Sequence, residues 1–425
     1  MRLCTVVLSI VIYTLAGTVV SAQAADTDAN TPVGLEDYLR LAALNNAGVK
    51  AEFEQWKATL EQIPQAKALP DLEFTYERVI EMSQTKVGVM QVFPWFGEIK
   101  AKTDAASSSA NAAQKRYEAK KLELFFTVKE AFFEYVYLAS AIESTKESLE
   151  LIKHLEEVAR AKYISATAYH PDVIRAQVEL AKAEEQLKSI EQMREPVVAR
   201  LNAALNRKSP GMLPWPRKQQ FQANKVDHRQ VLEMLKTRNP QLQAMELDVH
   251  SARSQIEVAR KRSYPNIGVG VGLMDTDSEM SGSSGNNNSL MLMFGANIPL
   301  WSSSYRAGKL QAQAELRRAS HQKIEAENTL VASAHEVLYE LDDSAREMKL
   351  YGDILVPKSK QLLGASETAY KAGTIDFLSL IDAQQTLLGF QLQYERAAAN
   401  NQQRLAELEM LVGAELLPPK AQDKP

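Results

Sequence analysis

Residues 267–273 read Ile-Gly-Val-Gly-Val-Gly-Leu, so every second residue is aliphatic and every residue between is glycine. Successive side chains of a β-strand point to opposite faces, and this segment therefore predicts a strand with one apolar face and one face of bare backbone. Residues 290–298 alternate in the same way, with Met291 and Met293 opposite a second apolar face. That face is formed by Leu290, Leu292, Phe294, Ala296 and Ile298.

Two further strands are expected earlier in the chain. One begins at Pro70-Asp71-Leu72 and alternates apolar side chains with mainly acidic ones, and a less regular one covers roughly residues 85–93. Runs of about nine to eleven residues are long enough to cross a bilayer at a tilt. The same alternation also fits a half-buried hairpin packed on the helices of a water-soluble protein.

The four strands belong to two units with the same succession of features. The first pair of strands ends at Phe93-Pro94-Trp95-Phe96 and the second at Ile298-Pro299-Leu300-Trp301, and a long helical stretch follows each. Tyr163 precedes Ala176-Gln177 by the same number of residues as Tyr370 precedes Ala383-Gln384. This repeated order of elements predicts a duplicated structural unit.

The helical stretches are too long for an ordinary globular core. Residues 98–163 contain neither proline nor glycine, and at roughly 1.5 Å per residue they predict a helix about 100 Å long. Each long stretch is expected to turn back at a tip into a shorter helix, and Pro196 and Pro357 are expected to bend the helices in which they lie. The tips are expected at residues 165–171 and 372–376, and the returning helices at 172–205 and 377–412.

The 425-residue chain carries 49 Lys and Arg against 53 Asp and Glu, so it lacks the basic charge that nucleic-acid binding requires. Residues 1–24 combine Arg2, an apolar run and Ala22-Gln23-Ala24. They predict a cleaved secretion signal, with an uncleaved membrane anchor as the alternative. The single cysteine, Cys4, lies inside this segment, so no disulfide is expected after cleavage. No later apolar stretch reaches the roughly eighteen residues of a membrane helix.

The expected fold class is mainly α with a small β part: two long helical hairpins and four strands. The expected segments are a signal peptide (1–24), a helical segment (25–69), a first β-hairpin (70–94), a first long helical hairpin (95–205), a collar or linker (206–239), a helix (240–264), a second β-hairpin (265–299), a second long helical hairpin (300–413) and a flexible tail (414–425).

Four strands are too few to form a membrane barrel alone. An open sheet edge is not tolerated in lipid, and the smallest single-chain barrels have about eight strands. Several copies of the chain must then share one barrel, and three copies would supply twelve strands.

Together these features resemble the TolC family of outer-membrane channels over essentially the whole exported chain. The residues that carry the resemblance are Phe93-Pro94-Trp95-Phe96-Gly97, Ile298-Pro299-Leu300-Trp301, and the motif from Tyr370 and Gly373 to Ile381-Asp382-Ala383-Gln384, with its first copy between Tyr163 and Gln177. The resemblance implies a homotrimer with a twelve-stranded transmembrane β-barrel in the outer membrane and an α-barrel of long helices in the periplasm. A periplasmic adaptor protein, an inner-membrane pump and outer-membrane lipid are the implied partners, and no cofactor is expected.

The resemblance also implies functional residues at the helix tips and near the membrane. An aperture is expected from Asp172, Tyr370, Ser379 and Asp382, the last forming a ring of carboxylates in a trimer. Adaptor contacts are expected from Ala166, Tyr169, Gly373 and Asp376, and a membrane interface from Trp95, Phe96 and Trp301.

Three positions depart from the family pattern. Ser379 replaces an acidic residue, Ile375 stands where some members have arginine, and Ala166 replaces a glycine. Two aperture residues also fit ordinary structural roles, because Asp172 follows Pro171 at an expected helix start and Tyr370 could be packing in a helical seam.

The expected function is a passive exit channel for cargo delivered by the pump, with heavy-metal ions or drugs as the cargo. The Phe-Pro-Trp-Phe-Gly stretch is similar to the branch of the family that serves heavy-metal efflux. Type I protein secretion and a soluble periplasmic coiled-coil scaffold are the alternatives. An enzyme is disfavoured because the sequence has no nucleophile elbow or phosphate loop, and its six histidines show no ligand-pair spacing. Met291 and Met293 could contact a soft metal, although lining or packing is the simpler interpretation.

Overall fold

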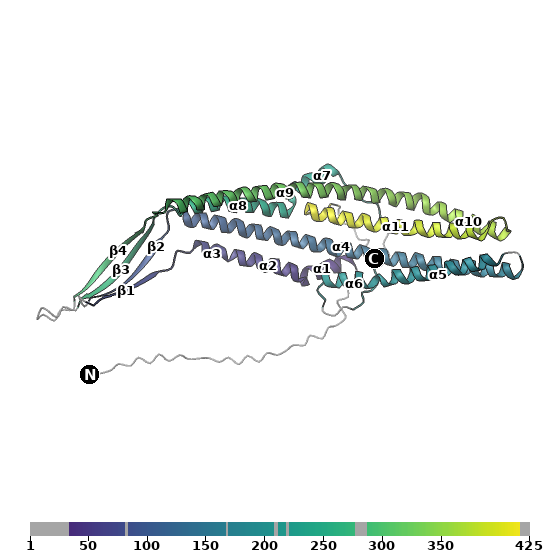
Figure 1. The fold of residues 1–425 in the computed structure, drawn as a ribbon, viewed down its shortest axis with the longest axis horizontal. Coiled ribbons are helices and arrows are strands. Elements are labelled where there is room, and N and C mark those ends of the chain that lie inside the picture. The colour runs from purple at the N-terminus through teal and green to yellow at the C-terminus, as the bar shows by residue number, and fades with distance from the viewer. Residues whose placement is uncertain are drawn as a thin grey trace, which may run out of the picture.

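The computed structural model describes residues 34–80, 84–166, 169–207, 211–217, 221–276 and 287–416, so the expected signal segment lies outside the described residues. Four strands form one antiparallel sheet in the order β1-β2-β3-β4. The sheet projects from one end of the helices instead of lying beneath them (Figure 1). The predicted fold class, mainly α with a small β part, is confirmed. The strands are β1 (Glu73–Val79), β2 (Gln84–Phe93), β3 (Asn266–Thr276) and β4 (Asn287–Asn297).

The long helices follow the strands in both repeats. In the first repeat, α4 runs for 67 residues without interruption. The helices of this repeat are α1 (Leu35–Asn45), α2 (Ala47–Leu60), α3 (Gln62–Lys67), α4 (Glu98–Ile164), α5 (His170–Gln192) and α6 (Arg194–Ala204). Those of the second are α7 (His228–Arg238), α8 (Pro240–Lys261), α9 (Ser302–Lys349), the π-helix η1 (Leu350–Leu355), α10 (Val356–Ala372) and α11 (Phe377–Val412).

The two prolines that were expected to bend helices both lie where the structure interrupts regular α-helix. A proline ring clashes with the carbonyl group four residues earlier. The expected returning helix of the first repeat is accordingly split between α5, which ends four residues before Pro196, and α6. Pro357 follows the π-helical turn η1, so the helical hydrogen bonds widen where the proline would otherwise collide with the backbone.

The expected linker, residues 206–239, contains the helix α7. Its N-cap is Asp227, whose carboxylate accepts hydrogen bonds from the backbone nitrogens of Arg229 and Gln230 at 2.9 and 3.2 Å. Val231 and Leu235 are buried against α9 and α11. The prolines and glycine earlier in this segment suggested irregular backbone and concealed this short amphipathic helix.

The helices form a single layer (Figure 1). Near the sheet, the contacts give the order α2 and α3, then α4, α8 and α9; farther away, the order is α5, α4, α11 and α10. One edge of the layer therefore comes from the first repeat and the other from the second. The sheet has the same arrangement, since β1 and β4 are its edge strands. Within the described residues, no helix is both long enough and apolar enough to span a membrane.

An asparagine joint holds each repeat together at the middle of the layer. The Asn46 side chain caps α2 by accepting from the Val49 nitrogen at 3.1 Å, and its amide donates to the Ala204 carbonyl at the end of α6 at 3.0 Å. Asn239 caps α8 in the same way, at 2.9 Å, and donates to the Leu411 carbonyl in the last turn of α11 at 2.7 Å. Each joint thus fixes the start of one helix to the end of another.

Candidate functional site

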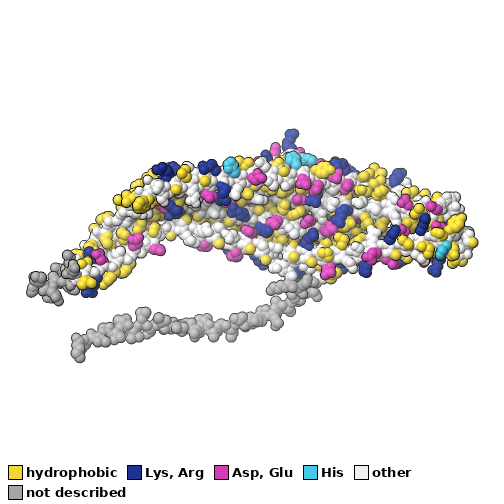
Figure 2. All heavy atoms as spheres, in the orientation of Figure 1, with side chains coloured by type: hydrophobic (Ala, Val, Ile, Leu, Met, Phe, Trp, Pro, Cys, Tyr) yellow, Lys and Arg dark blue, Asp and Glu magenta, His cyan; other side chains and the backbone are white. Residues whose placement is uncertain are grey.

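The strand register aligns the apolar residues of the sheet in rows. Phe74 lies opposite Val89, Val89 opposite Val271, and Val271 opposite Leu292. A second row contains Tyr76, Val87, Leu273 and Leu290. These side chains are exposed, and the exposed fraction is 67% for Phe74, 69% for Leu292 and 72% for Leu290. Hydrophobic side chains also cover much of the strand region in Figure 2. A continuous exposed apolar face of this kind requires an apolar environment.

The opposite face of the sheet carries polar residues and glycine. Glu73, Thr75 and Glu77 lie on this face of β1, and Lys86 of β2 is paired with Glu77 at 3.5 Å. Because the two faces differ so strongly, one suits lipid and the other suits water.

Aromatic residues gather where the strands become helices. The Trp95 ring stacks on Tyr264 with centroids 5.2 Å apart and lies edge-on to Phe96 at 5.9 Å. Phe96 and Trp301 expose 79% and 76% of their surface, whereas Trp95 is half-buried. Gly97 has a φ of 84°, a left-handed backbone conformation that favours glycine, and it links the strand to α4. Two of the three expected interface residues are therefore exposed.

Both helix tips end in the same backbone conformation. Gly373 follows α10 with a φ of 75°, and Ala166 follows α4 with a φ of 57°. The nitrogens of Ala166 and Gly373 donate to the carbonyls of Tyr163 and Tyr370, each at 3.0 Å. Ala166 thus occupies the left-handed position that glycine fills in the second repeat. Tyr169, just before α5, is 82% exposed.

Tyr370 lies at the centre of a buried cluster near the tips. Its ring is 4% exposed and packs edge-on against Phe377 with centroids 5.6 Å apart. Lys162 lies over the ring, 4.4 Å from its centroid, and donates to the Tyr370 carbonyl. Burial, followed by the negative charge of Asp172, raises the pKa of Tyr370. The charge of Asp172 therefore acts on the Tyr370 hydroxyl, which has no hydrogen-bond partner among the described residues.

Two expected tip residues, Asp376 and Ser379, form a helix cap. Asp376 is the N-cap of α11, and its carboxylate accepts from the Ser379 hydroxyl at 2.6 Å and from the Ser379 nitrogen at 3.0 Å. These hydrogen bonds lower the pKa of Asp376. Asp382, one turn farther along α11, is exposed like Ser379, so the two side chains lie on the same side of the helix.

Two tip interactions were not anticipated from the sequence. Lys162 contacts Tyr370 across 208 positions of sequence. The buried Gln384 donates to the Ser148 hydroxyl of α4. The repeated Ala-Gln pair was a usable signal for the second interaction, because Ala176 and Ala383 are both buried where helices cross. The adjacent glutamines differ, since Gln177 is exposed.

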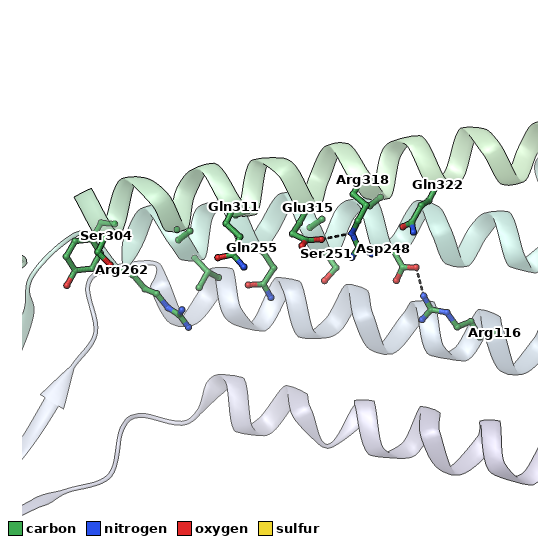
Figure 3. A pocket seen from close by; sticks show the side chains of 17 residues that line it. Arg116, Asp248, Ser251, Gln255, Arg262, Ser304, Gln311, Glu315, Arg318 and Gln322 are labelled. Atoms are coloured by element: carbon green, nitrogen blue, oxygen red, sulfur yellow. Dashed lines mark hydrogen bonds and ion pairs between the residues drawn. The ribbon is translucent and has the colours of Figure 1, made fainter. Parts of the chain in front are cut away.

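A groove of about 810 Å³ runs along the helical layer between α4, α8 and α9 (Figure 3). Arg116 of α4 pairs with Asp248 of α8 at one end, and Arg318 pairs with Glu315 on α9 at 2.6 Å. The remaining lining is mostly small or uncharged. In the described part of the chain, no group of three or more His, Cys, Asp or Glu residues is placed to hold a metal ion.

Comparison with known proteins agrees with this arrangement. The chain is similar to the cobalt-zinc-cadmium resistance protein CzcC of Cupriavidus metallidurans, with 22% identity over 403 residues and 91% of each chain covered. Its fold is similar to that of a membrane protein from Pseudomonas aeruginosa (TM-score 0.77, 17% identity, 89% and 90% covered). It is also similar to that of the outer membrane protein VceC from Vibrio cholerae (0.75, 16%, 90% and 97%).

A third similar structure is the open state of the MtrE outer membrane channel of Neisseria gonorrhoeae, with a TM-score of 0.73, 20% identity, and 90% and 89% of the two chains covered. The family model for outer membrane efflux proteins matches residues 41–207 and 231–414, which include most of the helices and all four strands. The chain belongs to the outer membrane efflux protein family, and it is an efflux channel of the outer membrane.

Proposed function

We propose that three copies of the chain form a closed, water-filled conduit. The observation that carries this proposal is the matching pair of free edges in the sheet and the helical layer. Strands β1 and β4 are edge strands of a sheet whose apolar face is exposed. An unpaired strand edge in lipid leaves backbone N–H and C=O groups without hydrogen bonds, which is unfavourable. Pairing β4 of one copy with β1 of the next supplies those hydrogen bonds.

The helices support the same closure. At the β4 edge lie α9 and α10, and at the β1 edge lie α2, α3 and α5. Joining the strands of neighbouring copies therefore also places α9 beside α2 and α3. Three copies supply 3 × 4 = 12 strands, a number within the range of known membrane barrels.

The proposed conduit belongs to a tripartite efflux system. The helix tips lie farthest from the sheet (Figure 1), where a periplasmic adaptor and an inner-membrane pump would reach them. Exposed Tyr169 and Gly373 and the cap residue Asp376 are the proposed adaptor contacts, together with Ala166. Asp172, Tyr370, Ser379 and Asp382 form the proposed aperture.

Metal cations are the proposed cargo. The support is the similarity to CzcC, whose name specifies cobalt, zinc and cadmium resistance. An exposed carboxylate at Asp382, repeated three times around one axis, would attract cations to the aperture.

Cysteine cross-linking between edge strands tests the trimer. The Cys4→Ser background removes the only natural cysteine. In it, Tyr76→Cys on β1 and Leu290→Cys on β4 are combined and treated in membranes with a flexible bis-maleimide. The spacer must be shorter than the roughly 14 Å of three strand spacings that separate the two positions within one chain. We then expect covalent dimers and trimers, because β1 and β4 come that close only between neighbouring copies.

The matched control is Val87→Cys with Leu273→Cys, which lie opposite each other within one chain. This pair should give an internally cross-linked monomer. Monomer alone from the edge pair, with the control pair reacting, contradicts the trimer. Recovery of the chain in the soluble periplasmic fraction would instead favour the coiled-coil scaffold.

A further inference from the structure

The face of the sheet opposite the apolar rows carries methionines as well as polar residues. Met90 on β2, Met274 on β3, and Met291 and Met293 on β4 all lie on this face and are all half-buried. In the conduit proposed above, this face lines the water-filled lumen. The lumen of a transmembrane barrel is normally lined by polar side chains, so the grouping of thioethers there requires an explanation.

Glycines on neighbouring strands make room for these methionines. The Met293 side chain crosses β3 and lies over Gly88 of β2, where an added Cβ would be 3.2 Å from its sulfur. Met90 crosses in the opposite direction. Its sulfur lies 2.9 Å from the place of a Cβ at Gly268 and 3.4 Å from that of a Cβ at Gly295. Side chains at these glycines would displace the thioethers.

The thioethers are distributed along the direction of the strands. Met90 lies over Gly268 near the helical end of β3, and the Cε of Met291 lies 3.5 Å from the place of a Cβ at Gly272. Met274 is two residues farther along. From position 268 to position 274 a strand advances about 20 Å, at roughly 3.3 Å per residue. At a strand tilt of about 40° the series covers roughly 15 Å across the membrane, about half of the hydrocarbon thickness.

Carboxylates accompany the series. Glu73 of β1 lies directly opposite Met90 in the register and shares its face. Glu77 lies on the same face and is paired with Lys86. Negative charge beside a thioether raises the local concentration of cations, while the thioether itself discriminates among them by softness.

We propose that Met90, Met291 and Met293, with Met274 beyond them, form a binding track for soft monovalent cations of the Cu⁺ and Ag⁺ class. Thioethers are soft ligands that bind such ions in preference to hard cations. The unbranched methionine side chain changes rotamer readily, so neighbouring sulfurs can pass an ion along the lumen. This proposal rests on the conduit of the preceding section, because only a closed ring makes this face a lumen.

Silver binding by the purified trimer in detergent tests the track. Isothermal titration with Ag⁺ in chloride-free nitrate buffer compares the parent with the Met90→Leu, Met291→Leu, Met293→Leu triple variant. Leucine fills nearly the same volume but offers no sulfur. We expect the triple variant to bind Ag⁺ at least about tenfold more weakly, as is typical when a metal site is impaired. Zn²⁺ titrations should be the same for both proteins.

The control removes three thioethers from outside the sheet, with Met212, Met234 and Met245 each changed to Leu. It should retain the Ag⁺ affinity of the parent. K⁺ conductance in planar bilayers is measured on the same preparations. If the triple variant conducts K⁺ and binds Ag⁺ as tightly as the parent, the binding track is wrong and the proposed conduit stands. If the parent does not conduct K⁺, both proposals are wrong. If the triple variant does not assemble, the Met291→Leu, Met293→Leu pair replaces it, with the same expected direction.

Discussion

At the scale of single residues, Ala166 shows how the two repeats have diverged. Its φ of 57° places a Cβ in the left-handed region, where glycine stands in the second repeat. The left-handed conformation costs an L-residue about 1–2 kcal/mol. The resemblance to the channel family identified this position as a missing glycine, and the backbone explains why the difference matters.

We expect Ala166→Gly to stabilise the first tip by about 1 kcal/mol. The reason is that the relief of backbone strain outweighs the extra conformational entropy that glycine loses on folding. Hydrogen exchange of the amides in 161–166 should slow by about fivefold, which corresponds to that energy at 25 °C. Gly373→Ala is the matched reverse change. No atom lies within 4 Å of its added Cβ, so any acceleration of exchange in the second tip reports backbone strain alone. Unchanged exchange in both variants would show that neither tip is strained.

Residue roles at the tips were less predictable than residue positions. The spacing from tyrosine to Ala-Gln located the tips correctly, yet Ser379 is a partner of the Asp376 cap and Lys162 was missed. A cap is a local motif that Asp376 and Ser379, three positions apart, could have revealed. The contact of Lys162 with Tyr370 depends on how α4 packs beside α10 and α11, and no local pattern encodes that.

At the scale of elements, the asparagine joints connect helix ends that the sequence keeps far apart. Asn46 and Asn239 each use the carbonyl oxygen of the side chain as a cap and the amide nitrogen as a clasp. One side chain thereby satisfies a free N–H group at one helix start and a carbonyl in the last turn of another helix. The start of α8 was predictable from Asn239-Pro240, but the break between α1 and α2 at Asn46 and the clasped carbonyls were not.

Asn239→Asp separates the two roles of the joint. The aspartate carboxylate keeps the acceptor that caps α8, but it cannot donate to the Leu411 carbonyl. Asn239 is only 4% exposed in the parent, so water cannot replace that hydrogen bond. We expect the free energy of unfolding to fall by roughly 1–3 kcal/mol, the cost of an unsatisfied buried polar group. Faster hydrogen exchange at residues 405–413 measures it. Asn46→Asp, at a half-buried joint, should accelerate exchange less, in the last turn of α6. If Asn239→Asp is as stable as the parent, the hydrogen bond to the Leu411 carbonyl does not stabilise the fold.

At the scale of the whole molecule, the fold was more accessible from sequence than the site. Glycine–aliphatic alternation predicted β3, alternation of apolar with other side chains predicted the remaining strands less sharply, and the absence of proline and glycine from 98–163 predicted α4, which spans Glu98–Ile164. These signals are local and repeat along the chain. The pairing of β2 with β3 and the order of helices in the layer join segments far apart in sequence, so they required the structure.

The proposed cation aperture is tested on the assembled channel. We expect Asp382→Ala to lower the cation-over-anion permeability ratio in planar bilayers by a factor of at least about two, because three carboxylates leave one axis together. Glu54→Ala, which removes an exposed carboxylate from α2 far from the tips, should leave the ratio nearly unchanged. A ratio unaffected by Asp382→Ala would exclude this residue from the pore axis.

The order β1-β2-β3-β4 has a consequence for the symmetry of the proposed ring. The seam between β2 and β3 joins the two repeats within a chain, and the seam between β4 and the next β1 joins them between chains. In the helical layer of the proposed ring, α9 against the next α2 and α3 would stand in the same relation as α4 against α8 within a chain. Three chains then form six quasi-equivalent seams, three within chains and three between chains. The chain itself holds the first three together, so a ring that widens can separate only at the three seams between chains.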